Sequence, residues 1–438
     1  MPSFPLFAST SRRRFLYASS AAALAASLPG WKPRASAQPS GANSRVRVAV
    51  MGLNGRGMDH VRAFLALPNV EITAVCDVDE RAMTKASALV EKSRGTAPAA
   101  IKDIRQLVES KAIDALSIAA PNHWHAPATL LACAAGKHVY VEKPCSHTPR
   151  EGELMVRAAR KFHRKVQMGN QRRSWTGLRE AIAELHGGAI GKVTFARTWY
   201  NNQRPSIGRG KAVPVPAWLD YDLWQGPVEE RPFRDNVVHY NWHWFWHWGN
   251  GELGNNGIHA LDVARWGLRA GCPRQVTCGG GRYQFDDDQE TPDIYVTTFE
   301  LEGQGASWES HSHHGRGFEG SGFGITFYGD RGTFVISGNS MKFYDLNNKL
   351  TRELPHRGND LDHYGNFVEA IRNDVPLHSE IEEGVLSTLW CHLGNIAWRT
   401  RQTLQLDPAR QQLKNNDAAR KLWASGYRKG WRDLEKIA

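Results

Sequence analysis

Short apolar runs and helical patterns alternate through the first part of the chain. Runs of strand length lie at 45–51, 71–76, 113–120, 139–141 and 166–169. Stretches with helical periodicity separate these runs, and each parallel strand needs such a crossover to reach the next. The pattern predicts an α/β protein with a doubly wound parallel sheet, and we expect residues 45–170 to form a Rossmann domain.

The pattern changes after residue 170, where short strand-like runs follow one another and few helices separate them. These runs lie at 193–200, 275–280, 294–302, 306–311, 325–328, 332–337 and 341–344. Gly- or Asn-containing turns join them, which is typical of antiparallel pairing. The last hundred residues become helical, most clearly at 362–372 and 381–399. We therefore predict that residues 171–438 form a C-terminal α+β domain with a large, mostly antiparallel open sheet, which binds substrate and offers a face for self-association.

The N-terminus has the form of an export signal. Ser11-Arg12-Arg13-Arg14-Phe15-Leu16 precedes a modestly apolar run, and Ala35-Ser36-Ala37 offers a small-residue cleavage site. The stretch resembles a twin-arginine signal, so we predict a signal peptide at 1–37, the twin-arginine export machinery as a partner and a periplasmic location. An ordinary secretory signal or a basic tail are the alternatives. No apolar run reaches the ~20 residues that a membrane span needs, so none is predicted.

Charge and cysteine content exclude two other classes of site. Five of the eleven net positive charges lie before residue 38, and the six that remain are too few for the chain's size to predict a nucleic-acid partner. The six cysteines are scattered without metal-ligand spacing. His243 and His247 have the i, i+4 spacing of a metal pair, but glycines follow closely and no acid is positioned as a base. No metal is predicted.

A glycine-rich turn follows the first strand. It contains Gly52, Asn54, Gly55, Arg56 and Gly57, with Asn54 where the second glycine of a dinucleotide fingerprint is expected. Such glycines let the backbone approach a pyrophosphate at the start of a helix. The alternative is a tight turn without a ligand.

An acidic residue ends the second strand. Asp77 lies 25 residues after Gly52, at nearly the spacing expected of a ribose-binding carboxylate. A carboxylate there accepts hydrogen bonds from a ribose diol and repels a 2′-phosphate, so NAD is favoured over NADP. A helix cap is the bland alternative for this residue.

Two later strands also end in polar residues. Pro121, Asn122 and His125 follow one strand, and Glu142 and Lys143 follow the next. In open α/β sheets ligands bind outside the carboxyl ends of the strands, so Lys143 is expected at the crevice where cofactor and substrate meet. Helix capping and surface solvation are the alternative roles for these side chains.

The densest aromatic stretch, at 242–248, places four tryptophans within seven residues. Indole rings can stack on sugar faces, so Trp244 and Trp246 are candidate substrate contacts. His259 opens a helix shortly afterwards, where its imidazole can face a cleft.

Together these motifs resemble the glucose–fructose oxidoreductase and inositol dehydrogenase family, Gfo/Idh/MocA. The glycine turn, Asp77, Pro121-Asn122, Glu142-Lys143-Pro144 and Asn255-x-x-x-His259 occur in the family's order, and the match runs from about residue 45 to 400. The stretches 218–224 and 241–262 look like the family's exported bacterial branch. The resemblance implies NAD(P)-linked oxidation or reduction of sugars and polyols, and we expect a homo-oligomer formed through the C-terminal sheet.

The resemblance also implies roles for single residues. Lys143 would contact substrate and nicotinamide, and His259 would be the acid/base. The family usually has Asp where this chain has Asn255; an amide orients a hydroxyl but takes no proton. The expected cofactor contacts are Gly52, Asn54, Gly55, Arg56, Gly57, Asp77, Pro121, Asn122, His125, Glu142 and Lys143. The expected substrate contacts are Lys143, Arg172, Trp244, Trp246, Asn256 and His259.

Three functions are compatible with these motifs. The first is a sugar or polyol oxidoreductase that keeps its NAD bound, because an exported enzyme meets little free cofactor. The second is an NAD-dependent glycoside hydrolase that oxidises its sugar transiently, eliminates the aglycone and reduces the sugar again. The third is a non-catalytic protein that binds cofactor and sugar.

Overall fold

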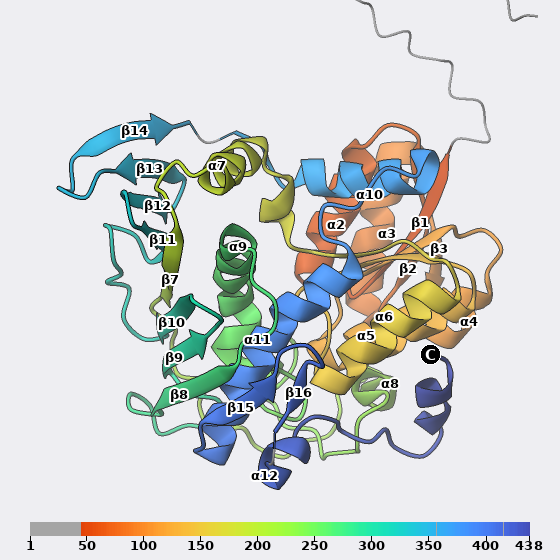
Figure 1. Cartoon of the computed structure of the whole chain (residues 1–438). Helices are drawn as coiled ribbons and strands as arrows, with labels where there is room; N and C mark the ends of the chain where they lie inside the picture. The colour runs from red at the N-terminus through yellow and green to blue at the C-terminus, as the bar shows by residue number, and fades with distance from the viewer. Residues whose placement is uncertain (1–44, 356, 415) are drawn as a thin grey trace, which may run out of the picture. The chain divides into compact units, whose positions relative to one another are not determined.

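A six-stranded parallel sheet forms the N-terminal part of the described chain (Figure 1). The computed structural model describes residues 45–355, 357–414 and 416–438, and the expected signal peptide lies outside them. The strands are β1 (Val46–Met51), β2 (Val70–Cys76), β3 (Ala99–Ile101), β4 (Ala115–Ile118), β5 (His138–Val141) and β6 (Val166–Met168). Their spatial order is β3-β2-β1-β4-β5-β6, so the winding reverses between β1 and β4, where a ligand crevice is expected.

Five helices connect these strands. They are α2 (Arg56–Ala66), α3 (Glu80–Arg94), α4 (Ile104–Glu109), α5 (Asn122–Ala134) and α6 (Pro149–Lys161). Helix α6 begins with a capping box, in which Thr148 Oγ1 accepts from the Glu151 N–H (3.3 Å) and the Glu151 carboxylate accepts from the Thr148 N–H (3.1 Å). This box fixes the start of α6, which follows shortly after Lys143 in the chain.

A ten-stranded sheet forms the C-terminal part, in the order β14-β13-β12-β11-β7-β10-β9-β8-β15-β16. Its strands are β7 (Val193–Asn201), β8 (Gln275–Gly281), β9 (Ile294–Glu300), β10 (Gly305–His311), β11 (Phe323–Gly329), β12 (Thr333–Ser337), β13 (Ser340–Tyr344), β14 (Leu350–Leu354), β15 (Leu404–Asp407) and β16 (Gln412–Leu413). Among the described strands of this sheet, only β7 and β10 pair in parallel, and every other neighbouring pair is antiparallel. The predicted fold class, a Rossmann sheet followed by a large, mostly antiparallel sheet, is confirmed.

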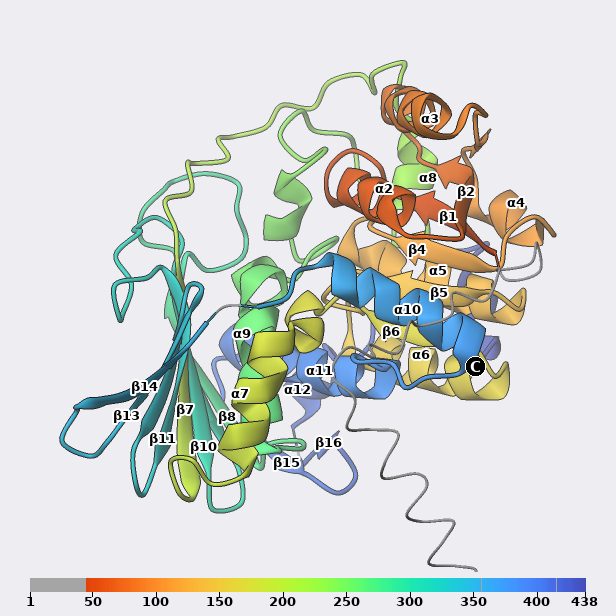
Figure 2. The same cartoon turned by 90° about the horizontal axis from the view of Figure 1, so that it is seen from above.

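One face of the large sheet is covered by helices. Figure 2 shows α7 (Thr176–His186), α9 (Ile258–Leu268) and α11 (Ile381–Thr400) between this sheet and the parallel sheet. Strand β9 alternates accordingly: Phe299 is buried and its ring stacks on Trp390 of α11 at 4.8 Å between centroids, whereas Val296 on the other face is exposed.

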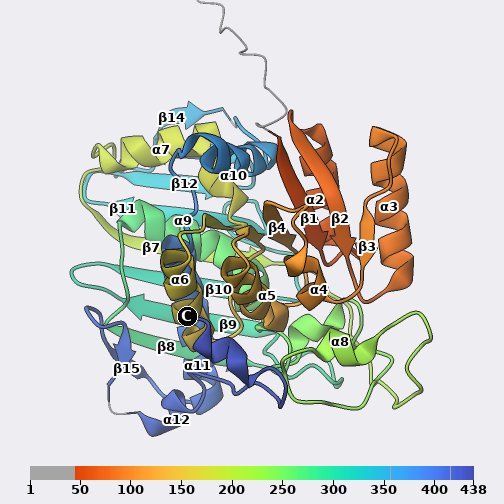
Figure 3. The same ribbon diagram turned by 90° about the vertical axis from the view of Figure 1, so that its right-hand side faces the viewer.

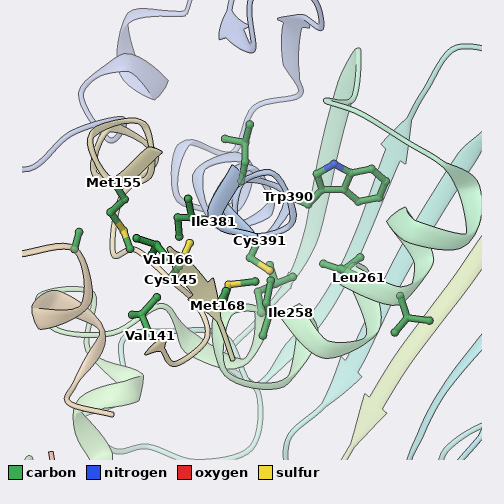
Figure 4. Packing of buried hydrophobic residues seen from close by; sticks show 14 of the residues in the cluster. Val141, Cys145, Met155, Val166, Met168, Ile258, Leu261, Ile381, Trp390 and Cys391 are labelled. Atoms are coloured by element: carbon green, nitrogen blue, oxygen red, sulfur yellow. The ribbon is translucent and has the colours of Figure 1, made fainter. Parts of the chain in front are cut away.

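The two sheets share one hydrophobic core. In Figure 4, Val141 and Met168 from the parallel sheet lie in the same cluster as Ile258 and Leu261 of α9 and Cys391 of α11. All of these side chains are fully buried. Because the core runs through both sheets, it holds the carboxyl ends of β4 and β5 in a fixed position relative to α9.

The chain makes a long excursion between β7 and α9, over residues 202–252. It contains the short helix α8 (Tyr221–Gln225) and the 3₁₀ helix η3 (Asn241–Trp244), and Figure 3 shows α8 at the lower edge of the parallel sheet, beside α4. Leu219 forms a β-bridge with Asp79, directly after β2. The excursion therefore reaches the carboxyl edge of the parallel sheet.

Among the described helices, none is long and apolar enough to cross a membrane.

Candidate functional site

A cavity opens at the carboxyl ends of β1, β2, β4 and β5, as the reversal of strand order requires. The cavity-lining residues that the sequence predicted as cofactor contacts are Gly52, Asn54, Gly55, Arg56, Asp77, Pro121, Asn122, His125, Glu142 and Lys143. Asn255 lines it from the C-terminal part, and Tyr240, Trp242 and His243 line it from the excursion. Ten of the eleven predicted cofactor contacts thus share one cavity, and Gly57 lies just behind it.

The glycine turn leaves no room for side chains where it meets the sheet. Gly52 has φ +83°, and a Cβ there would lie 2.5 Å from the Ala120 nitrogen. A Cβ on Gly57 would lie 1.7 Å from the Gly52 carbonyl oxygen. Gly55 differs, since nothing lies within 4 Å of its Cβ position. No side chain caps the first turn of α2, and of its N–H groups that of Met58 donates to the Gly55 carbonyl oxygen (2.9 Å). The turn fits a dinucleotide pyrophosphate, which the start of a helix favours.

The Asp77 carboxylate ties the glycine turn to the end of β2. Its Oδ2 accepts from the Leu53 N–H at 2.5 Å and its Oδ1 accepts from the Asp79 N–H at 2.9 Å. Burial raises the pKa of this carboxyl above its ordinary value. Each oxygen retains lone-pair capacity for a ribose hydroxyl, which fits the predicted preference for NAD.

Glu142 is held entirely by protein donors. Its Oε1 accepts from Arg56 Nε (3.2 Å), Gln171 Nε2 (2.9 Å) and His60 Nε2 (3.1 Å), while its Oε2 accepts from the Lys143 N–H (3.2 Å). The Arg56 charge and the His60 hydrogen bond outweigh burial and hold the pKa of Glu142 well below its usual range. Glu142 therefore positions both Lys143 and the start of α2.

Lys143 and Asn255 are hydrogen-bonded across the cavity. Lys143 Nζ donates to the Asn255 carbonyl oxygen at 2.7 Å and to Asn255 Oδ1 at 3.3 Å. Asn255 lies in a π-helical turn, η4 (Leu253–Gly257), an element found often at functional sites. Burial lowers the pKa of the Lys143 ammonium below its ordinary value. The pair joins residues that lie 112 positions apart in the sequence.

His259 is the second residue of α9, one turn beyond Asn255. Burial, the Lys143 charge and the Arg172 charge hold the pKa of its imidazole well below its ordinary value. The ring is therefore neutral at neutral pH and has a lone pair that can accept a proton. The structure thus places Lys143 in contact with Asn255, and His259 within electrostatic reach of Lys143.

The remaining predicted substrate contacts are placed differently. Trp244 is only 2% exposed and the Arg204 guanidinium lies 4.8 Å above its ring, so its faces are not free for a sugar. Trp246 lines a second cavity, together with residues such as His147 and Arg399. Asn256 Nδ2 donates to the Glu252 carboxylate.

The excursion contributes residues that the sequence did not assign to the site. His243 lines the cavity, its ring stacks on Trp242 at 3.6 Å between centroids, and its Nδ1 is 2.6 Å from the Tyr240 carbonyl oxygen. Burial lowers the pKa of His243 to about 3. The aromatic density at 240–248 was the available signal, but it did not indicate which rings face the cavity.

Two stretches of the chain match models of known protein families. Residues 46–170 match a family model described as "Oxidoreductase family, NAD-binding Rossmann fold", and residues 191–280 match one described as "Oxidoreductase family, C-terminal alpha/beta domain". A glycosyl hydrolase family 109 protein of Saccharopolyspora erythraea is 34% identical over 164 residues, which cover 36% of each protein. The chain thus matches about a third of the length of this curated relative.

Two solved structures share the fold at low identity. The WlbA dehydrogenase from Bordetella pertussis, in complex with NADH and UDP-GlcNAcA, has a TM-score of 0.64 at 18% identity, over 83% of this chain and 99% of that one. The aldose–aldose oxidoreductase from Caulobacter crescentus, complexed with glycerol, has a TM-score of 0.65 at 19% identity, over 83% of this chain and 100% of that one.

Proposed function

Because the chain belongs to the Gfo/Idh/MocA oxidoreductase family, we propose that it moves a hydride between NAD and a sugar, polyol or sugar derivative. The observation that carries the proposal is the contact of Lys143 with Asn255 in the cavity at the carboxyl ends of the parallel strands, with His259 one helical turn away. NAD, when bound, supplies the hydride acceptor.

The side chains divide the remaining chemistry between them. His259 accepts the proton of a sugar hydroxyl on an imidazole nitrogen, because its lowered pKa keeps the ring neutral. Lys143 Nζ stabilises the negative charge that develops on the same oxygen. Asn255 orients the hydroxyl through its amide but takes no proton, so proton removal rests on His259.

We propose further that the cofactor stays bound between turnovers. Three contacts tie the excursion to the loop after β2: the Glu80 N–H donates to Trp218 O (3.2 Å), the Asp220 N–H donates to Val78 O (3.0 Å), and His239 Nε2 lies 2.8 Å from Asp79 Oδ2. These contacts keep the excursion over the edge of the cavity where a ribose is expected, and dinucleotide release requires them to open.

A bound cofactor must be restored within each cycle. Either a second sugar takes the hydride, or the same sugar takes it back after elimination of an aglycone. The second route makes the protein a glycoside hydrolase, and it is favoured by the name of the relative from Saccharopolyspora erythraea. A non-catalytic binding protein is the remaining alternative.

One experiment separates these functions. The purified protein is desalted rapidly and assayed without added NAD against a panel of sugars, polyols and p-nitrophenyl glycosides, with absorbance at 340 nm and product release followed together. Sustained turnover without net NADH supports a closed cycle, and aglycone release identifies the hydrolase. A protein that comes out empty and needs stoichiometric NAD is a plain dehydrogenase. Bound NAD without turnover on any compound refutes catalysis.

We propose a periplasmic location reached by the twin-arginine route, on the strength of residues 11–37. We also propose that copies pair through the large sheet. Its uncovered face carries the exposed side chains Val296 and Tyr328, 47% and 39% exposed, which association would bury. Analytical ultracentrifugation of the wild-type protein and a Val296→Lys variant tests this pairing.

A further inference from the structure

The guanidinium of Arg172 lies against two aromatic rings at the junction of the two sheets. It lies in the 3₁₀ helix η2 (Gln171–Ser174), directly after β6. Its guanidinium carbon is 4.5 Å from the ring centroid of Trp175 and 4.3 Å from that of Phe323, the first residue of β11. Such cation–π contacts hold the guanidinium without using its N–H donors, which remain for a planar acceptor.

No carboxylate pairs with this guanidinium within the described residues. Three other buried or half-buried arginines near the site are each paired with an acid: Arg173 with Asp262 (2.8 Å), Arg56 with Glu142 (3.2 Å) and Arg204 with Glu252 (2.7 Å). Burying a guanidinium without a counter-charge destabilises the folded protein. An unpaired, largely buried arginine near a site therefore suggests that a ligand supplies the counter-charge.

The acid that acts on Arg172 from a distance is already engaged. Asp360 Oδ2 accepts from Arg56 Nη2 (3.1 Å) and its Oδ1 accepts from Trp175 Nε1 (3.3 Å). Burial without a close partner lowers the pKa of Arg172 to about 10, so the side chain is still a cation at neutral pH.

Arg172 acts on the proposed base from the same site. The charges of Lys143 and Arg172 both lower the pKa of His259, so both cations lie within electrostatic reach of its imidazole. Lys143 is hydrogen-bonded to a neutral amide rather than to an acid. The carboxylate next to Lys143, that of Glu142, also acts on His259, but its Oε1 is already engaged by Arg56 and His60. Arg172 has no such carboxylate partner among the described residues, so a compound bound beside it is expected to supply negative charge.

We propose that Arg172 binds the carboxylate of a sugar acid, such as a uronic acid, through its free N–H edge. The inference rests on the proposed function and specifies the substrate class of the same site. A planar carboxylate matches the guanidinium fork with two parallel hydrogen bonds, whereas a neutral sugar leaves the fork unpaired. Charge-assisted hydrogen bonds of this kind distinguish acid from neutral parent by roughly 10- to 100-fold in Kd.

Matched pairs of sugars test the assignment by calorimetry on the full-length NAD-containing protein at fixed pH and ionic strength. The pairs are glucose with glucuronate, galactose with galacturonate and mannose with mannuronate, and glucose 6-phosphate is added as a different anion. We expect at least one uronate to bind 10-fold or more tightly than its parent. In Arg172→Gln the preference disappears, so that a uronate and its parent bind with similar Kd, and in Arg172→Lys part of the preference survives.

Arg197→Gln is the matched control. Arg197 also stacks on a ring, with its guanidinium carbon 3.7 Å from the Phe318 centroid, but it is paired with Glu309 at 3.3 Å. This variant should keep the full preference. The assignment is wrong if no uronate binds better than its parent, if the preference survives Arg172→Gln, or if the phosphate outcompetes every uronate.

The same samples separate this inference from the proposed function. A neutral sugar that reduces the bound NAD while uronates bind no better refutes the sugar acid and leaves the oxidoreductase intact. Uronate binding that depends on Arg172, without any change in absorbance at 340 nm or any product release, supports the sugar acid and refutes the proposed catalysis.

Discussion

Glu142→Gln tests whether the carboxylate behind Lys143 organises the site. The two side chains have nearly the same shape, so packing is preserved while one charge is lost. If the amide oxygen replaces Oε1, it keeps the donors Arg56, His60 and Gln171, and the NH₂ group then faces the Lys143 N–H. The reverse orientation sets the NH₂ group against three donors. Either way at least one buried donor is left unsatisfied.

The cost follows from burial. An unsatisfied buried donor costs about 1–3 kcal/mol. Loss of the negative charge opposite Arg56 destabilises the protein further. Breaking a fully buried ion pair costs ~3–5 kcal/mol, but the cost here is smaller, because the Arg56 side chain is 36% exposed and keeps its ion pair with Asp360. We expect a loss of about 3–4 kcal/mol of unfolding free energy, which corresponds for a chain of this size to a Tm lowered by roughly 4–5 °C.

The pH dependence gives a second test of the same carboxylate. The pKa of Glu142 is depressed in the folded state, so its contribution is complete above its ordinary value of 4.5 and is lost as pH falls through the folded pKa. The gap between wild type and Glu142→Gln should therefore be constant near neutral pH and shrink only below pH about 4.5.

Urea unfolding followed by tryptophan fluorescence measures this gap from pH 3.5 to 8. Glu71→Gln is the control, because Glu71 forms an exposed ion pair with Arg45 and should change stability by less than about 1 kcal/mol. A Glu142→Gln protein within about 0.5 kcal/mol of wild type at pH 7, or a gap that does not shrink in acid, refutes the reasoning.

Three further outcomes are expected. Asp77→Ala should narrow the preference for NAD over NADP in titrations of apoprotein, and tighter NADP binding by the wild type would overturn the role of Asp77. In single-turnover reduction of bound NAD, the rate should fall in acid with a midpoint below pH 6.5, since His259 must be neutral. It should fall in alkali with a midpoint below pH 10.5, since Lys143 must be charged. A midpoint of the acid limb above pH 6.5 contradicts the assignment. Arg12→Lys with Arg13→Lys should hold the protein in the cytoplasm, as cell fractionation would reveal, and normal export of this variant excludes the twin-arginine route.

The strands were the most predictable part of the fold. The runs at 71–76 and 193–200 are realised as β2 (Val70–Cys76) and β7 (Val193–Asn201), because apolar and β-branched residues buried in a sheet leave a clear local pattern. Strand β3 (Ala99–Ile101) and helix α4 (Ile104–Glu109) were missed. They have three and six residues, too few to give a period of their own.

The cofactor side of the site was predictable for a similar reason. In a parallel sheet every carboxyl end points to the same edge, so motifs that follow different strands must meet there. The aromatic stretch obeys no such rule. Trp244 and Trp246 lie only two positions apart, yet one is buried beneath Arg204 and the other lines a second cavity, because the 3₁₀ helix η3 and its turn, rather than composition, decide which way each ring points.

The contact between Lys143 and Asn255 depends on one feature that the sequence does not reveal, the π-helical turn, and on one that it does, the amide at position 255. The π-helical turn η4 disturbs the regular carbonyl ladder, and the Asn255 carbonyl oxygen accepts from Lys143 Nζ. The side chain is an amide, so it positions this ammonium without neutralising it, whereas a carboxylate at 255 would form an ion pair and raise the pKa of Lys143. Asn255 therefore leaves the positive charge of Lys143 available for the oxygen of the substrate. It does not provide the second proton acceptor that a carboxylate would place beside His259.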